Sequence, residues 1–127
     1  MRIIAIISLL ISLISIPFSA YGALPTTIIQ SCYDGDTCTT IDGKKIRLAC
    51  IDTPELKGKN ANRIPAEEAR DFLNQLVANK KVSIKRITKD RYGRTVAEIY
   101  KDGKNIQELI VKKGYGKIYK RYSYQCE

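Results

Sequence analysis

Three short stretches of the chain hold most of the residues whose types could do chemistry. They are Asp34-Gly35-Asp36-Thr37, the run from Arg47 to Asp52-Thr53-Pro54-Glu55, and Asp90-Arg91-Tyr92-Gly93-Arg94. Hydrolysis of a phosphodiester needs a cation or arginines to stabilise charge on the phosphorus oxygens, and a base to orient and deprotonate water. The carboxylates and guanidinium groups of the three stretches together make up such a set.

Local structure also accounts for several of these residues. Asp34-Gly35 is a common turn pair, and Asp36 and Asp52 could serve as cap or turn residues. Tyr92-Gly93-Arg94 by itself is typical of an exposed turn. Arg47 is harder to explain in this way, because it lies in an apolar strand segment and a charge there needs a partner. On local grounds the chemical and the structural interpretations both stay open.

The chain contains no histidine. Ribonucleases with paired histidines, nucleases with a histidine-bound metal and hydrolases with a serine–histidine pair all need an imidazole, so these classes are excluded. The four cysteines include no CxxC pair, which argues against a zinc site. Any catalysis must therefore use carboxylates, arginines and hydroxyl groups, with or without a hard metal ion.

The chain is basic, with 22 Lys and Arg residues against 13 Asp and Glu and a net charge of +9. A charge of this size on a short chain favours an anionic partner, because Lys and Arg displace counterions from phosphate groups. A solvated basic surface that keeps the protein soluble would have the same composition. Charge alone does not decide between these two interpretations.

The N-terminal segment differs from the rest of the chain. Met1-Arg2 is followed by an apolar run from Ile3 to Phe18 and then by small residues, which is typical of a secretory signal peptide. We predict a signal peptide at 1–22 and a mature domain at 23–127, located outside the cell or in the periplasm. A membrane anchor is the alternative, but the run is shorter than the roughly 20 apolar residues that span a bilayer. No stable membrane association is therefore expected after cleavage.

The chemistry-bearing stretches need elements that position them, and five segments rich in β-forming residues predict strands. These segments are 26–33, 37–41, 44–51, 82–87 and 95–100. Asp42-Gly43 predicts a hairpin between the second and third segments, because Gly adopts a positive φ without strain. The sequence from Asp90 to Gly93 predicts the turn that joins the last two.

Two helices are predicted between and after these strands. Pro65 suits a first helical turn, and it is followed by one apolar stripe at helical spacing, made of Ala69, Phe72, Leu73, Leu76 and Val77. Asn105 and Glu108 form a capping-box arrangement at the start of a second helix, and Gly114 suits its end. Residues 56–64 have no period and predict a basic loop. The order of elements predicts an α+β fold with a five-stranded OB-type β-barrel.

All four cysteines lie in the predicted mature domain, where an exported chain can form disulfides. Strand alternation places Cys50 on the same face as Ile46 and Leu48 and opposite Arg47, so Cys50 has the pattern of a small buried apolar residue. Cys126 lies near a terminus that would otherwise fray, so we expect it to be bonded.

Taken together, the motifs resemble the staphylococcal nuclease (thermonuclease) family. The resemblance rests on four ordered stretches, Asp34-Gly35-Asp36-Thr37, Ile46-Arg47-Leu48, Ile51-Asp52-Thr53-Pro54-Glu55 and Asp90-Arg91-Tyr92-Gly93-Arg94. It continues through Tyr100-Lys101-Asp102-Gly103-Lys104 and the second helix, and covers about residues 26–122. The resemblance implies a calcium-dependent nuclease that acts on DNA and RNA, which we expect to be a monomer.

The resemblance also implies a metal site. The carboxylates of Asp36 and Asp52 would bind calcium, and Thr53 would contribute its backbone carbonyl. Calcium prefers several oxygen ligands in a flexible shell and usually keeps some waters. Two carboxylates and a carbonyl leave room for water and for a substrate oxygen.

The remaining implied roles concern the phosphate and the water. Glu55 would be the general base, and Arg47 and Arg94 would hold the scissile phosphate and stabilise the transition state. Arg91 and Tyr92 fall where the family contacts the terminal phosphate and the flanking nucleotide.

The sequence departs from the family pattern near its C-terminus. A long third helix is expected to be missing or vestigial, and Cys126 would replace its contribution by tethering the end of the chain. We expect Cys32 to be its partner, with Cys38 as the second choice. A tyrosine that the family uses near the substrate base falls at Lys120, with Tyr119 and Tyr122 as neighbours.

Two other function classes compete with the enzyme. A catalytically inactive OB module would bind nucleic acid without cleaving it, but it would not need the carboxylates and arginines together. A small disulfide-linked basic protein could act on membranes, but it would need an exposed amphipathic helix. The apolar stripe 72–77 is instead required for the core.

Overall fold

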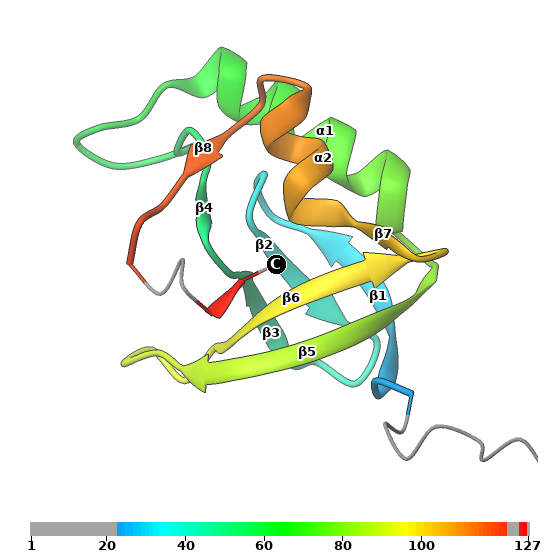
Figure 1. The fold of residues 1–127 in the computed structure, drawn as a ribbon. Coiled ribbons are helices and arrows are strands. Elements are labelled where there is room, and N and C mark those ends of the chain that lie inside the picture. Colours follow the sequence, from blue (N-terminus) through cyan, green and yellow to red (C-terminus); the bar gives the residue numbers. More distant parts are fainter. Residues whose placement is uncertain (1–22, 122–124, 127) are drawn as a thin grey trace, which may run out of the picture.

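The protein is described by a computed structural model, which covers residues 23–121 and 125–126 (Figure 1). The predicted signal peptide at 1–22 lies outside the described residues, as does Tyr122. In the part of the chain that the structure describes, no helix is long and apolar enough to cross a membrane.

Five strands form a closed barrel. Their bounds are β1 Thr26–Cys32, β2 Thr37–Thr40, β3 Lys45–Leu48, β5 Lys81–Lys89 and β6 Thr95–Lys101. Neighbours in the order β3-β2-β1-β5-β6 pair antiparallel, and β3 also pairs with β6 in parallel, which closes the barrel. The short strand β7 (Lys104–Asn105) extends the sheet beyond β6. The predicted five-stranded OB-type barrel is therefore confirmed.

The hairpins follow the predicted turn chemistry. Gly43, with φ of +83°, lies in the turn between β2 and β3, and the Thr40 hydroxyl donates a hydrogen bond to the Asp42 carboxylate there. Gly93, with φ of +79°, lies in the turn between β5 and β6. Glycine adopts these left-handed conformations at little cost, so both turns are set by residues next to each other in sequence.

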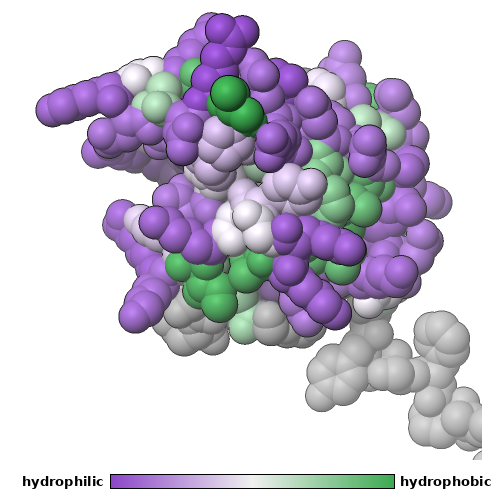
Figure 2. Space-filling view, turned by 90° about the horizontal axis from the view of Figure 1, so that it is seen from above, coloured by the Kyte–Doolittle hydropathy of each residue, from purple (hydrophilic) through white to green (hydrophobic). Residues whose placement is uncertain are grey.

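Two α-helices pack above the barrel in Figure 1. Helix α1 (Arg63–Val77) begins just before Pro65 and buries the face formed by Ala66, Ala69, Leu73 and Val77. Helix α2 (Ile106–Lys112) begins as predicted, because the Asn105 side chain accepts a hydrogen bond from the Glu108 N–H at 3.0 Å. Seen from above, most of this side of the molecule is hydrophilic, with smaller apolar patches between the polar side chains (Figure 2).

The third predicted strand is shorter than expected. The segment 44–51 is divided into β3 and β4 (Ile51–Asp52), because Cys50 adopts a positive φ of 65° that no extended strand allows. Beyond this bend, β4 pairs with β8 (Lys117–Ile118), and Asp52 lies opposite Lys117. The C-terminal segment is thereby brought against the end of the third motif-bearing strand. The described residues after β8 contain no α-helix.

The disulfides correct two expectations. Cys126 is bonded, as predicted, but its partner is Cys50 and not Cys32. Cys32 pairs with Cys38, because these two residues lie opposite each other in the β1–β2 ladder with Cα atoms 3.8 Å apart. Cys50 is not a buried apolar side chain of the strand, since it is half-buried, lies in the bend beyond β3 and forms this disulfide.

Candidate active site

Asp36 lies at the centre of the first motif and is almost fully buried, with 6% of its surface exposed. Its backbone N–H donates to the Asp34 carboxylate at 3.0 Å, so the Asp34-Gly35 pair also forms the turn that the sequence suggested. The Thr53 N–H donates to Asp36 Oδ2 at 3.1 Å, and the Leu48 N–H donates to the Asp36 carbonyl at 2.8 Å. The loop is therefore joined to both ends of the second motif.

Gly35 allows this loop to approach helix α1. A Cβ atom at Gly35 would lie 2.7 Å from the Cβ of Ala69 and 2.8 Å from Oγ1 of Thr53. Such distances are shorter than any normal contact between these atoms, so only glycine fits here without a shift of the backbone. The small side chain of Ala69 on α1 and the absence of one at Gly35 together determine how deeply Asp36 is buried.

Arg47 pairs with the buried carboxylate of Asp36 and with the half-buried carboxylate of Asp52. Its Nη2 lies 3.3 Å from Asp36 Oδ2 and 3.7 Å from Asp52 Oδ1, and its Nη1 donates to the Leu48 carbonyl at 2.6 Å. The side chain of Arg47 is 18% exposed, whereas that of Asp52 is 45% exposed. Two carboxylates from different parts of the chain therefore converge on one guanidinium group. They are the partners that a charged residue in an apolar strand needs.

Burial raises the pKa of the Asp36 carboxyl group from its usual 3.8 to about 6. The positive charge of Arg47 acts in the opposite direction, and the nearby carboxylate of Asp34 adds to the increase. Asp36 is consequently costly to ionise without a further positive charge beside it. A divalent cation would supply that charge.

The donor set fits a hard divalent cation. Asp36 and Asp52 offer carboxylate oxygens close to one point, and Thr53 Oγ1 is a buried oxygen with no hydrogen-bond partner among the described residues. In the same part of the chain, no three His, Cys, Asp or Glu side chains gather as a metal-binding group. Two carboxylates with backbone oxygens and water match calcium better than metals that need several nitrogen or sulfur ligands.

The β5–β6 hairpin carries the third motif, and Asp90 organises it. Asp90 Oδ2 accepts from Arg94 Nε at 2.6 Å, while its Oδ1 accepts from the backbone N–H groups of Tyr92 and Arg94 at 2.9 and 3.0 Å. Burial alone would raise the pKa of Asp90, but these hydrogen bonds hold it below the usual value. The hairpin therefore holds the Arg94 guanidinium in a defined position.

Tyr92 is the exposed aromatic residue of this hairpin, with 68% of its surface accessible. The guanidinium carbon of Arg91 lies 4.9 Å from the centre of its ring, and that of Arg94 lies 5.5 Å away. Arg91 Nη2 also contacts the Tyr92 hydroxyl at 2.7 Å. Arg91, Tyr92 and Arg94 thus form one compact basic group.

A cleft of about 550 Å³ joins the second and third motifs. Five of the predicted site residues line it, namely Arg47, Asp52, Arg91, Tyr92 and Arg94. Tyr119 and Arg121 complete the wall from the C-terminal segment. The sequence pattern indicated no role for Arg121 and placed Lys120 at the position of a family tyrosine, whereas Tyr119 is the residue that lines the cleft. The signal in the sequence was the presence of tyrosines beside basic residues in this segment.

Glu55 has fewer contacts with the site than the other predicted residues. Its backbone bridges Ala61, and its carbonyl accepts from the Asn62 N–H at 2.9 Å, but the residue is exposed. Within residues 23–121 and 125–126, no hydrogen bond or ion pair joins its carboxylate to Asp36, Asp52 or Arg47. The structure therefore brings two carboxylates and the arginines together and leaves the third carboxylate at the edge.

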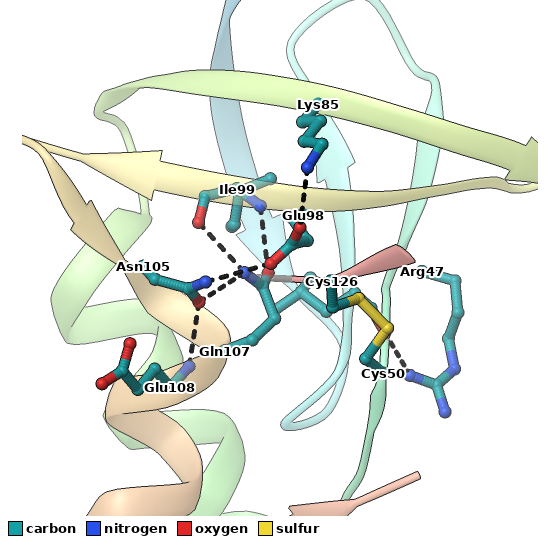
Figure 3. The surroundings of a disulfide bond; sticks show 10 residues. Arg47, Cys50, Lys85, Glu98, Ile99, Asn105, Gln107, Glu108 and Cys126 are labelled. Carbon is teal, nitrogen blue, oxygen red and sulfur yellow. Dashed lines mark hydrogen bonds and ion pairs between the residues drawn. A yellow bond between two sulfur atoms is a disulfide. The ribbon is translucent and has the colours of Figure 1, made fainter. Parts of the chain in front are cut away.

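A buried polar network lies around Glu98, near the Cys50–Cys126 disulfide (Figure 3). Glu98 on β6 is 1% exposed, and it contacts Lys85 at 3.6 Å and accepts from Asn105 Nδ2 at 3.0 Å. The Gln107 amide bonds both the N–H and the carbonyl of Ile99, at 3.0 and 3.2 Å, which fastens α2 to β6. Of these residues, only Asn105 was singled out from the sequence, as the cap of the second helix. The Cys50–Cys126 disulfide lies between this network and Arg47 in Figure 3.

The chain is similar to several proteins whose names describe nucleases. The family model described as "Staphylococcal nuclease homologue" matches residues 45–127. An "Uncharacterized endonuclease" of Escherichia coli O157:H7 is 35% identical over 94 residues, covering 71% of this chain and 58% of its own length. A Haemophilus influenzae "Uncharacterized endonuclease" is 40% identical over 95 residues, covering 72% of this chain and 51% of that protein.

A third relative is the "Endonuclease YncB" of Bacillus subtilis, which is 35% identical over 102 residues. That match covers 75% of this chain and 48% of the relative. The chain therefore spans about half the length of the curated relatives that it matches.

Proposed function

The chain belongs to the staphylococcal nuclease family, and on this basis we propose that it is a calcium-dependent nuclease that hydrolyses phosphodiester bonds in DNA and RNA. The observation that carries the proposal is the convergence of Asp36 and Asp52 on Arg47, at a cleft that also contains Arg94. An inactive binding module would have no need for two carboxylates held together beside arginines.

In the proposed reaction, Asp36, Asp52 and the Thr53 carbonyl would hold calcium, which when bound would supply positive charge to stabilise the phosphate. Arg47 and Arg94 bind the scissile phosphate and stabilise the additional charge of the transition state. Arg91 and Tyr92 hold the flanking nucleotide. Their placement along one cleft supports these assignments.

Glu55 is proposed as the general base. The water proton passes to its carboxylate, the water oxygen bonds to phosphorus, and the bond from phosphorus to the leaving oxygen breaks. The leaving oxygen takes a proton from solvent water and departs as an alcohol. Its position two residues after Thr53 supports the assignment. Its exposure means that the carboxylate must be oriented by bound water and substrate, since catalytic hydrogen bonds often tighten only in the complex.

The test is digestion of supercoiled plasmid DNA and of single-stranded RNA with calcium or with excess chelator. We expect cleavage with calcium and little with chelator. The Asp52→Asn variant should lose calcium-dependent cleavage and the calcium-dependent increase in Tm. Asp42→Asn, which alters an aspartate in the β2–β3 turn, should keep both. Undiminished cleavage in chelator would contradict the calcium proposal, and binding without cleavage would favour the inactive OB module.

We further propose that the protein is exported and acts as a monomer outside the cytoplasm. The N-terminal apolar run supports export. N-terminal sequencing of the protein from the extracellular or periplasmic fraction should find Ala23 as the first residue. Recovery of the intact N-terminus on membranes would contradict this proposal.

A further inference from the structure

A second hollow, of about 450 Å³, adjoins the Asp36 loop and shares no residue with the cleft of Arg47 and Arg94. It is lined by Tyr33, Leu56, Lys57, Arg63, Glu67 and Arg70, a group called here the Tyr33 subsite. Tyr33 directly precedes Asp34, and Leu56 directly follows Glu55. The hollow is therefore lined by residues directly next to the first and second motifs, yet none of the roles proposed above uses it.

Tyr33 is an exposed aromatic ring on a rigid backbone. It is 54% exposed, and its N–H donates to the Thr37 carbonyl at 2.8 Å. The preceding residue, Cys32, is bonded to Cys38, and its N–H and carbonyl are both bound by the Asn74 side chain at 2.8 and 3.0 Å. A ring held in this way would lose little conformational freedom when a flat ligand stacks on it.

The other wall of the hollow is basic. Arg63, Glu67 and Arg70 follow each other at helical spacing and share one face of α1. Arg63 Nε contacts Glu67 at 2.8 Å and Arg70 Nε contacts Asp71 at 2.9 Å, and each guanidinium group has further N–H donors that can bind an anion. Lys57 adds a third positive charge, so the lining holds three bases and one acid.

Helix α1 adds to this positive potential. It begins at Arg63 and has no acidic residue in its first turn, so a positive side chain lies at the positive end of the helix dipole. That arrangement is unfavourable for an isolated helix, and an anion bound in the hollow would offset it.

We propose that the Tyr33 subsite binds single-stranded nucleic acid, with an unpaired base stacked on Tyr33 and backbone phosphates bound by Arg63, Arg70 and Lys57. An exposed ring between basic side chains is the arrangement that binds single strands, whereas paired bases do not offer their faces for stacking. The inference rests on the proposed nuclease function. Since the subsite and the Tyr92 cleft adjoin different parts of the carboxylate cluster, the subsite takes nucleotides on one side of the scissile bond only.

The experiment uses oligonucleotides with one cleavable phosphodiester among phosphorothioate linkages, which keep their charge. They are extended from the cleavable bond either towards the 5′ end or towards the 3′ end, and a dinucleotide serves as the short substrate. Tyr33→Leu should lower kcat/KM by about tenfold on one extended series, the contribution expected for one stacked base. The dinucleotide and the other series should be cleaved as by the unaltered protein.

Three further variants separate the causes. Tyr33→Phe keeps the ring and should retain cleavage of both series. Arg63→Ala should weaken the same series as Tyr33→Leu and reduce the salt dependence of binding by about one counterion. Lys104→Ala removes an equal charge from an exposed residue outside both pockets and should change neither property.

Two outcomes would overturn the inference. One is an equal loss on the dinucleotide, which would mean that Tyr33 acts only by supporting the Asp36 loop. The other is no loss on either extended series. Fluorescence anisotropy with a fully phosphorothioate strand, without calcium, measures the subsite separately from cleavage. Tyr33→Leu should weaken that binding even if the protein cleaves nothing, so failure of the nuclease proposal is distinguishable from failure of the subsite.

Discussion

At the scale of single residues, Asp36 combines deep burial with a carboxyl group that can carry a negative charge. Its pKa is about 6 in the folded protein and 3.8 when unperturbed, so the folded state holds the proton more tightly. The contribution of Asp36 to stability is therefore complete below 3.8 and is lost as pH rises through about 6. Near neutral pH, the ionised carboxylate destabilises the metal-free fold, and a bound cation would offset this cost.

The first prediction follows from this direction of the pH dependence of stability. Asp36→Asn should stabilise the metal-free protein near neutral pH by at most roughly 3 kcal/mol, from a difference of about two pKa units. The gain should vanish at acidic pH, where the carboxyl group of the unaltered protein is already neutral. Urea unfolding at several pH values in chelator measures it. Asp42→Asn should give no such gain, because the pKa of Asp42 is lowered. A stability gain independent of pH would contradict the explanation.

The second prediction concerns the two arginines, which have different surroundings. Arg47→Ala and Arg94→Ala should each lower turnover by roughly a hundredfold or more, since each stabilises charge in the transition state. Arg47→Ala should also lower Tm in chelator, because Asp36 and Asp52 would lose the cation between them. Arg94→Ala should lower Tm less, because Asp90 keeps its backbone hydrogen bonds. Equal effects on Tm would show that the Arg47 ion pairs contribute little.

The third prediction separates the general base from the binding groups. Glu55→Gln should lower turnover as strongly as the arginine substitutions, about a hundredfold, because the amide cannot accept the water proton. Substrate affinity should be largely kept, since the side chain is exposed and makes no contact with the arginines in the described residues. Single-turnover cleavage and a binding assay in chelator measure the two effects. Near-normal turnover would require a different base.

At the scale of elements, α1 is the support of the active-site loop. Ala69 leaves the space that Gly35 needs, and Asn74 binds both backbone groups of Cys32 at the end of β1. Asn74 also donates to the Arg70 carbonyl within the helix at 3.1 Å. The helix thereby fixes the start of the loop that carries Asp36, and the same face continues into the Tyr33 subsite.

The fourth prediction tests that support. Asn74→Ala leaves the N–H and the carbonyl of Cys32 without partners and should destabilise the protein by about 1–3 kcal/mol. Gln75→Ala, at the exposed neighbouring position, should have little effect. Chemical denaturation measures the stabilities, and hydrogen exchange at Asp36 should show a more open loop in Asn74→Ala alone. An unchanged exchange rate would mean that the disulfide suffices to hold the loop.

At the scale of the whole molecule, two long-range links hold the fold together. The parallel pairing of β3 with β6 closes the barrel, and the Cys50–Cys126 disulfide joins residues 76 positions apart. That disulfide holds the segment that contributes Tyr119 and Arg121 to the cleft. The Cys32–Cys38 disulfide joins residues only 6 positions apart and acts within one strand pair.

The fifth prediction uses this difference in loop length. Cys50→Ala with Cys126→Ala should cost roughly 4 kcal/mol of stability, whereas Cys32→Ala with Cys38→Ala should cost roughly 2, on the chain-entropy estimate. Both pairs are compared by thermal and urea unfolding of oxidised protein. The first pair should also weaken nucleotide binding in the cleft. The reverse order of stabilities would show that packing around the buried Cys32 and Cys38 outweighs loop closure.

The sequence by itself determined the features that depend on neighbouring residues. The Asp42-Gly43 turn, the Asn105 cap of α2 and the apolar face of α1 each involve side chains within one or two turns of chain, so their spacing is readable directly. The order of strands and helices then predicted the barrel. The motifs also indicated most of the residues that line the cleft. Each motif alone could be explained as local structure, and only their combination and order pointed to the site.

Tertiary structure alone decided how distant segments meet. The bend at Cys50 depends on a positive φ that alternation of apolar residues does not reveal. Cys126 is therefore bonded to Cys50, and not to Cys32 as the sequence predicted. The burial of Asp36 depends on the fit of Gly35 against Ala69 and Thr53, and the place of Arg121 depends on the pairing of β4 with β8. Each of these is a contact between residues far apart in sequence, whose geometry arises only when the barrel and helices pack.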